Sequence, residues 1–183
     1  MVAGLYKDFL ANGIDGIWND MNEPSVFDGP GGTMPVSNIH LGGGNLPTGT
    51  HLMYHNAYGR LMVEASYNGI LAANPDKRPF VLSRSNILGG QRYAAMWTGD
   101  NEATYEQMKL SVPMSITLGL SGQPFNGPDI GGFAGNTIAD LWGHWLGFGA
   151  FFPFSRGHAS CDTNNKEPFG HLLRIYRESH VLH

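Results

Sequence analysis

Apolar residues repeat with two different periods along the chain, and these periods predict helices alternating with short strands. Residues 2–12 place apolar side chains on one side of a helix that ends at an Asn-Gly pair, and an apolar strand follows over residues 14–18. Residues 28–49 are rich in glycine and proline, which predicts a long loop over a site. A second helix, ending before Pro75, is predicted from apolar positions three and four residues apart: Leu52, Ala57, Tyr58, Leu61, Met62, Ala65 and Ile70.

Four further apolar stretches predict strands, and polar side chains follow each of them. The stretches are residues 80–82, 94–97, 124–127 and 150–154, and the polar side chains are Arg84, Asp100, Asp129, and the pair Arg156 and His158. Helical patterns at 105–110 and 139–146 lie between the later strands. The carboxyl ends of the strands in a (β/α)8 barrel share one face, so these side chains would converge there. A doubly wound open sheet, which also binds ligands at strand ends, remains as the alternative.

The length of the chain favours only part of such a barrel. Eight βα units take about 250 residues, whereas this sequence of 183 residues supplies five strands. We therefore expect the C-terminal part of a (β/α)8 barrel, about strands 4 to 8, incomplete as a standalone chain because open edges would expose its core. Residues 1–168 are predicted to form this partial catalytic domain, and residues 169–183 a divergent tail.

Composition and charge exclude several classes of protein. With 42% apolar residues, 14% charged residues and a net charge of −4, the chain is predicted to be globular and not to bind nucleic acid. Cys161 is the single cysteine, so no internal disulfide is possible. The sequence shows neither a basic and apolar leader nor a run of 18 apolar residues, so we expect no membrane partner and favour a cytoplasmic location.

Two of the polar strand ends carry a carboxylate beside a tryptophan. Residues 18–24 read WNDMNEP and contain Asp20, and residues 97–101 read WTGDN and contain Asp100. Glycoside hydrolysis needs two such acids, one ionised to attack the sugar and one protonated for the leaving oxygen. Either Asp alone would more often be a turn or helix-cap residue.

Five ordered segments together resemble the catalytic barrel of glycoside hydrolase family 31, and most closely its α-glucosidases of the glucosidase II type. The segments are residues 18–24, 83–85, 97–101, 127–133 and 153–158, and the similarity runs from about residue 4 to Pro168. The resemblance implies that Asp20 is the nucleophile and Asp100 the acid/base of a retaining enzyme, whose carboxyl groups lie about 5 to 5.5 Å apart. Arg84 and Arg156 would keep Asp20 ionised.

The resemblance also implies which residues hold the glucosyl ring. Arg84, Asp129 and His158 would bind ring hydroxyls. Apolar surface would come from Trp18, Trp97 and Phe133, with Met21 beside the nucleophile and Arg156 close behind. No cofactor or metal is implied. The family's first barrel strands and its accessory β domains, which complete the subsites, would be supplied from outside this chain.

Other interpretations of single residues stay open. Arg84 and Arg156 could be structural ion-pair partners, and Asp129 could cap a glycine turn. Glu23 is expected to support the site or start a helix, and Trp142 and Trp145 are expected to pack in the core. His51 and His55 could share a helix face but lack the glutamate of a zinc motif, and His171, His180 and His183 lie in a tail with no readable period. The glycines at residues 42–44 lack the Lys and Ser/Thr of a phosphate loop.

The sequence therefore predicts a retaining α-glucosidase that hydrolyses terminal α-linked glucose from oligosaccharides. An α-glucosyltransferase of the same family would use the same intermediate and differ in its acceptor. A carbohydrate-binding remnant without catalytic activity is the alternative from another functional class. The activity of the 183-residue chain by itself is doubtful, since its barrel would be incomplete.

Overall fold

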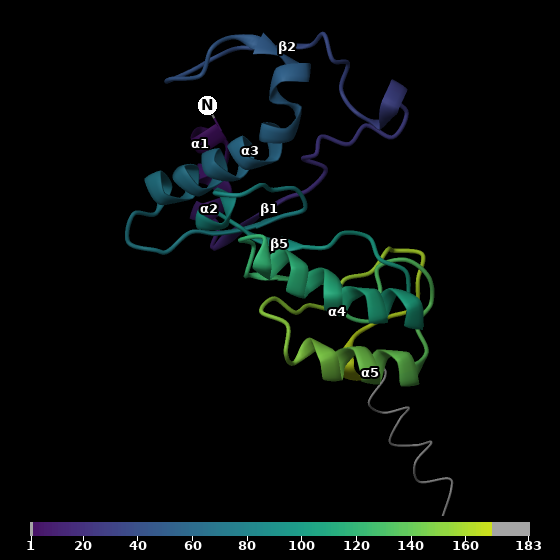
Figure 1. Cartoon of the computed structure of the whole chain (residues 1–183). Helices are drawn as coiled ribbons and strands as arrows, with labels where there is room; N and C mark the ends of the chain where they lie inside the picture. Colours follow the sequence, from purple (N-terminus) through teal and green to yellow (C-terminus); the bar gives the residue numbers. More distant parts are fainter. Residues whose placement is uncertain (1, 170–183) are drawn as a thin grey trace, which may run out of the picture. The chain divides into compact units, whose positions relative to one another are not determined.

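The computed structural model describes residues 2–169 and divides the chain into two compact units, residues 1–96 and 97–183 (Figure 1). Residues 170–183 lie outside the described part, and with them His171, His180, His183 and most of the predicted tail. The division into domains at residue 168 stays a prediction. Each unit is described by itself below.

The first unit contains the predicted helices and strands with shifted ends. The first predicted helix is divided into α1 (Val2–Leu5) and α2 (Lys7–Ala11), and the first strand is β1 (Gly16–Asn19). The long helix α3 (His51–Ala73) ends just before Pro75, as the proline requires. Strand β4 (Phe80–Ser83) and the 3-10 helix η2 (Gly90–Arg92) follow. The first two residues of strand β5 (Ala95–Trp97) end this unit, and Trp97 belongs to the second.

The predicted loop over residues 28–49 is not wholly irregular. It begins with a 3-10 turn, η1 (Pro30–Gly32), and then forms strand β2 (Ile39–His40). Strand β2 pairs antiparallel with β3 (Gly49–Thr50) at the start of α3. Such short strands carry too few alternating residues for a period to be recognised in the sequence.

Parallel pairing places β4 between β1 and β5, as expected for βα units. Asn19 is the register partner of Ser83, and Ser83 is in turn the partner of Met96. Helix α3 connects β1 to β4 and packs on both strands. The polar residues that follow β1 and β4 therefore leave the sheet at the same edge.

A continuous apolar core explains this arrangement. Leu10, Val63, Ile70, Val81 and Ala94 form it, so α2, α3 and β4 all bury one face in the same cluster. Val63 and Ile70 are 0% and 2% exposed, although the apolar stripe of α3 is interrupted by polar residues.

The second unit contains two helices that pack against each other, α4 (Tyr105–Leu120) and α5 (Ala139–Gly149), as Figure 1 shows. Helix α4 is ten residues longer than predicted and includes Pro113. Strand β6 (Asn126–Gly127) packs against α4, and Thr98 N donates to Gly127 O at 3.2 Å.

The apolar core of the second unit lies between its helices. Its buried members are Met108, Ile130, Leu141 and Trp145. Trp142 and Trp145 are 2% and 0% exposed, as expected for core residues.

The prediction of a strand over residues 150–154 is wrong. These residues form turns and bends, and parallel pairing is limited to one bridge between Asp129 and Arg156. Phe154 N donates to Asn126 O, and Ile130 N donates to Arg156 O. Pro153 has no N–H, so an apolar run that contains it is poorly suited to a longer ladder.

Among residues 2–169, no helix is long and apolar enough to cross a membrane.

Truncation of Ile70 tests the core of the first unit. We expect Ile70→Ala to lower the free energy of unfolding by about 2 to 5 kcal/mol, because it removes buried methyl groups and leaves a cavity. Leu52→Ala, on the same helix at a side chain that is 73% exposed, is the matched control and should change it by less than about 1 kcal/mol. Urea unfolding measures both, and equal losses would contradict the assignment of the core.

Candidate functional site

Asp20 immediately follows β1, at the edge where the parallel strands end. Its Oδ1 accepts a hydrogen bond from Met21 N at 2.8 Å, and Met21 has a φ of 58°, an uncommon conformation for a residue with a side chain. Its side chain is 37% exposed. The tight turn thus fixes one carboxylate oxygen of Asp20 through the backbone N–H of the next residue.

Arg84 follows β4, the neighbouring strand, and lies between two carboxylates. Its Nε is 2.8 Å from Glu23 Oε1 and 3.3 Å from Asp20 Oδ1, and its Nη2 donates to Glu23 Oε2 at 3.0 Å. Nη2 also lies 3.0 Å from the sulfur of Met21. The structure therefore brings together three residues predicted for the site, Asp20, Met21 and Arg84, and adds Glu23 to them.

Glu23 has a larger place in this cluster than the sequence suggested. Burial alone would raise its pKa, but hydrogen bonds from Arg84 and Ser25 outweigh that effect and hold the pKa of Glu23 below its usual value. Glu23 is therefore a carboxylate partner that keeps the fork of Arg84 in one orientation. The sequence shows that Glu23 lies three residues after Asp20, but it does not show that Arg84 is the partner of Glu23.

Asn22 links the two loops that carry Asp20 and Arg84. Its amide nitrogen donates to Ser83 Oγ at 2.9 Å, and its amide oxygen accepts from Ser85 N at 3.1 Å. The side chain is 1% exposed, so these hydrogen bonds are protected from water. Trp18, on β1, is 44% exposed, and its contact with a sugar stays a prediction.

A second cluster, in the second unit, contains Trp97, Asp129 and Arg156. Arg156 Nε lies 3.2 Å from Asp129 Oδ1, and its guanidinium lies over the Trp97 ring, 5.1 Å from the centroid. Trp97 is 1% exposed. Its burial beneath Arg156 differs from the open apolar surface that the sequence predicts.

Asp129 is fully buried, and this burial dominates its titration. Desolvation raises the pKa of Asp129 from 3.8 to about 7; Arg156 and Lys166 oppose this rise, and the charge of Asp100 adds to it. Its second oxygen, Oδ2, makes no hydrogen bond to any residue that the structure describes. This buried oxygen therefore has hydrogen-bonding capacity that no described residue uses.

Asp100 and the ring pair of Phe133 and His158 belong to the same unit. Asp100 is exposed, follows Gly99 with a φ of 90°, and lines a cavity of about 120 Å³ with Asn101 and residues of α4. The rings of Phe133 and His158 lie 5.1 Å apart. Phe133 N donates to Asn101 O at 2.7 Å, which ties the aromatic residue to the segment that carries Asp100.

The predicted acids are divided between the units, Asp20 in the first and Asp100 in the second. The separation of their carboxyl groups therefore stays a prediction. Between residues 2 and 169, no group of three or more His, Cys, Asp or Glu side chains could hold a metal ion. His51 instead forms hydrogen bonds with His40 and His55, each at 3.0 Å.

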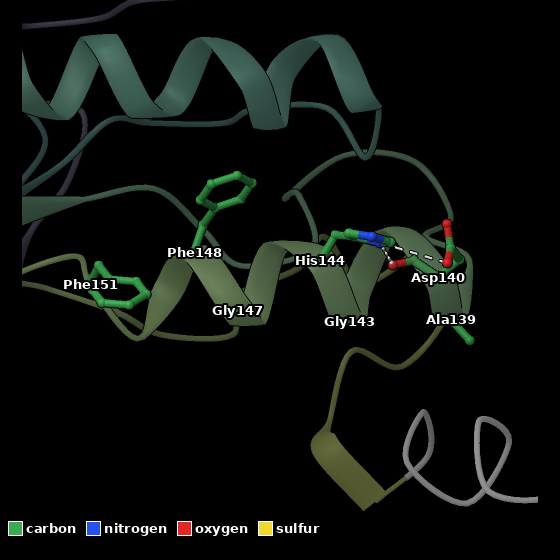
Figure 2. Close-up of a pocket in the computed structure, with 7 residues that line it drawn as sticks. All are labelled: Ala139, Asp140, Gly143, His144, Gly147, Phe148 and Phe151. Atoms are coloured by element: carbon green, nitrogen blue, oxygen red, sulfur yellow. Dashed lines mark hydrogen bonds and ion pairs between the residues drawn. The ribbon is translucent and has the colours of Figure 1, made fainter.

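A larger pocket lies along one face of α5 and contains none of the predicted site residues (Figure 2). Its volume is about 540 Å³. It is lined by Ala139, Asp140, Gly143, His144, Gly147, Phe148 and Phe151. Most of these residues recur three and four positions apart along one helix, and His144 Nδ1 lies 3.6 Å from Asp140 Oδ1 within the pocket lining. We therefore place the candidate site at the strand ends and not in this pocket.

Comparison with known proteins decides the family. The model of the glycosyl hydrolases family 31 TIM-barrel domain matches residues 2–178.

The chain belongs to glycoside hydrolase family 31.

Two curated relatives in family 31 come from very different organisms. The chain is 52% identical over 154 residues to a probable glucan 1,3-alpha-glucosidase of Oryza sativa, a match of 84% of this chain and 16% of the relative. It is 49% identical over 157 residues to alpha-glucosidase 2 of Bacillus thermoamyloliquefaciens, with 86% and 20% covered. The chain thus spans no more than one-fifth of these relatives.

Solved structures of family 31 agree with the fold. The glucosidase II alpha subunit superposes with a TM-score of 0.83 at 44% identity, over 93% of this chain and 18% of that chain. The family 31 alpha-glucosidase of Bacteroides thetaiotaomicron gives 0.76 at 60% identity, over 91% and 26%. The prediction of a partial (β/α)8 barrel is confirmed, and the doubly wound alternative is excluded.

The titration of Asp129 gives a pH-dependent prediction. Since its folded-state pKa, about 7, exceeds its usual 3.8, the folded protein binds the extra proton between these values. This carboxyl group therefore lowers the free energy of unfolding progressively as pH rises from about 4 to 7. We expect Asp129→Asn to gain stability relative to the wild type across that window.

Urea unfolding at pH 4.5, 6 and 8 measures this difference. Asp28→Asn, which removes an exposed carboxylate, is the control and should show no comparable trend. A difference between Asp129→Asn and the wild type that stays constant from pH 4.5 to 8 would show that Asp129 is not held protonated by burial.

Proposed function

We propose that the chain carries the nucleophile and the acid/base of a retaining α-glucosidase that releases terminal α-linked glucose from oligosaccharides. Membership of family 31 supports this, as does the α-glucosidase activity named for its relatives. The chain spans 16% to 20% of those relatives, so the activity is proposed for the full-length protein that contains it.

The arrangement of Asp20 is the observation that carries the proposal. Its Oδ1 is bound by Met21 N and lies beside Arg84 Nε. Both of these contacts go to the same oxygen, Oδ1. A nucleophile requires this division: one oxygen is fixed and stabilised as an anion, and the other can attack. Arg84 in turn is oriented by Glu23, with which it forms an ion pair.

The proposed reaction has two steps. Asp20 Oδ2 attacks the anomeric carbon while Asp100 gives its proton to the departing oxygen, which forms a covalent glycosyl-enzyme with inverted configuration. Asp100, now ionised, removes a proton from water, and the water oxygen displaces Asp20 from the same carbon. Two inversions give net retention. Attack by a sugar hydroxyl in place of water would give glucosyl transfer, which product analysis distinguishes.

We propose that the remaining site residues hold the glucosyl ring. Asp129 Oδ2 and His158 would bind ring hydroxyls, and Arg84 would do so through its guanidinium beside Asp20. Trp18 and Phe133 would provide apolar contact, with Met21 next to the nucleophile. Trp97 would support the sugar indirectly, because Arg156 covers its ring.

Removal of the proposed nucleophile tests this function. We expect Asp20→Ala in the full-length protein to lower kcat for a nitrophenyl α-glucoside by at least about 10⁴-fold, because no other group can form the glycosyl-enzyme. Asp76→Ala, at an exposed carboxylate, is the control and should keep the wild-type rate. Near-normal hydrolysis by a folded Asp20→Ala variant would overturn the assignment.

A further inference from the structure

Lys166 is a buried lysine for which the proposed reaction has no use. It is 5% exposed, and its ammonium group donates to three backbone carbonyl oxygens, those of Gly132, Phe133 and Gly135. The distances to Phe133 O and Gly135 O are 3.2 and 3.0 Å. Burial lowers the pKa of Lys166, and the charge of Asp129 opposes that shift. All three donors of the ammonium group are therefore used to hold one loop.

The loop that Lys166 holds has an unusual backbone. Gly131, Gly132 and Gly135 have φ values of 84°, 83° and 75°, in the left-handed region that glycine adopts without a steric cost. A β-carbon at Gly132 would lie 2.5 Å from Ala103 N, so the loop packs too closely on the segment after Asp100 for a side chain at this position. The carbonyl of Gly132, which is buried, needs a donor, because a buried carbonyl oxygen without one is costly.

Lys166 is itself fixed to the core of the unit. Its backbone oxygen accepts a hydrogen bond from Trp142 Nε1 at 3.1 Å, and Trp142 is 2% exposed. The backbone of Lys166 is therefore anchored to α5, and its side chain holds the loop against that helix.

The opposite edge of the loop is bound to the residue after the proposed acid/base. Phe133 N and Ala134 N both donate to Asn101 O, at 2.7 and 3.0 Å, and Ala103 N donates to Ala134 O at 2.8 Å. Asn101 Nδ2 also reaches Asp129 O at 3.3 Å. A continuous set of hydrogen bonds thus leads from Lys166, through the loop, to the backbone on which Asp100 is carried.

We propose that Lys166 is a positioning residue for the acid/base Asp100, acting through the loop of residues 131–135 and Asn101. This inference rests on the proposed function, in which Asp100 gives its proton to the leaving oxygen. Loss of the ammonium group releases three carbonyls, lets the loop relax, and moves Asp100 away from the leaving oxygen. A shift of this kind impairs proton transfer more than it impairs attack by Asp20.

Two substrates that differ in their need for an acid separate this role from a merely structural one. Maltose has a poor leaving group and requires a proton from Asp100, whereas α-glucosyl fluoride loses fluoride with little assistance. We expect Lys166→Met in the full-length protein to lower kcat/KM for maltose at least about tenfold more than kcat/KM for α-glucosyl fluoride. Lys109→Met, at an exposed lysine of the same unit, should change neither value.

Asp100→Ala, measured in parallel, distinguishes failure of the inference from failure of the proposed function. It should show the same selective loss on maltose, and to a greater degree. If it does so while Lys166→Met loses both activities equally or neither, the positioning role is overturned and the function stands. If Asp100→Ala shows no selectivity, Asp100 is not the acid, and both proposals fall.

A variant that keeps the charge covers the case in which Lys166→Met does not fold, which circular dichroism would reveal. Lys166→Arg retains a cation but cannot place its planar donors on all three carbonyls as the ammonium group does. We expect a selective loss on maltose of the same direction and smaller size. Equal activity of a folded Lys166→Arg variant on both substrates, relative to the wild type, would overturn the proposal.

Discussion

The guanidinium of Arg84 is the group on which the first polar cluster depends. Asp20 and Glu23 are both carboxylates, and Arg84 contacts them at 3.3 and 2.8 Å. Parallel pairing of β1 with β4 brings this cation to them, because Asn19 and Ser83 are register partners and the next residues leave the strands together. Backbone pairing therefore sets the electrostatics of the proposed nucleophile.

The second unit contains the same kind of ion pair in a more buried environment. Arg156 contacts Asp129 at 3.2 Å, but Asp129 is 0% exposed, so burial outweighs the arginine and raises the pKa to about 7. Asp20, at 37% exposure, keeps contact with water. Similar pairs can thus give one carboxylate suited to attack and one suited to hydrogen bonding, which is how we assign them.

Much of this arrangement was predictable because it follows from local patterns. Apolar runs located most strands, and the shared edge of parallel strands predicted that Arg84 would lie near Asp20. The apolar run at residues 150–154 was misleading, since it forms turns. Glu23 was expected to support the site or start a helix, but its partner Arg84 was not foreseen. Lys166 was missed altogether, because charged residues do not show in sequence which distant groups will bind them. Only the folded backbone places three carbonyls around one lysine.

The anomeric form of the first product tests the central claim most directly, namely that two carboxylates act in a retaining reaction. The full-length protein is incubated with maltose, and the glucose released from the non-reducing end is followed by proton NMR before mutarotation. The account predicts that this glucose appears first as the α-anomer. Initial formation of the β-anomer would contradict the roles assigned to Asp20 and Asp100.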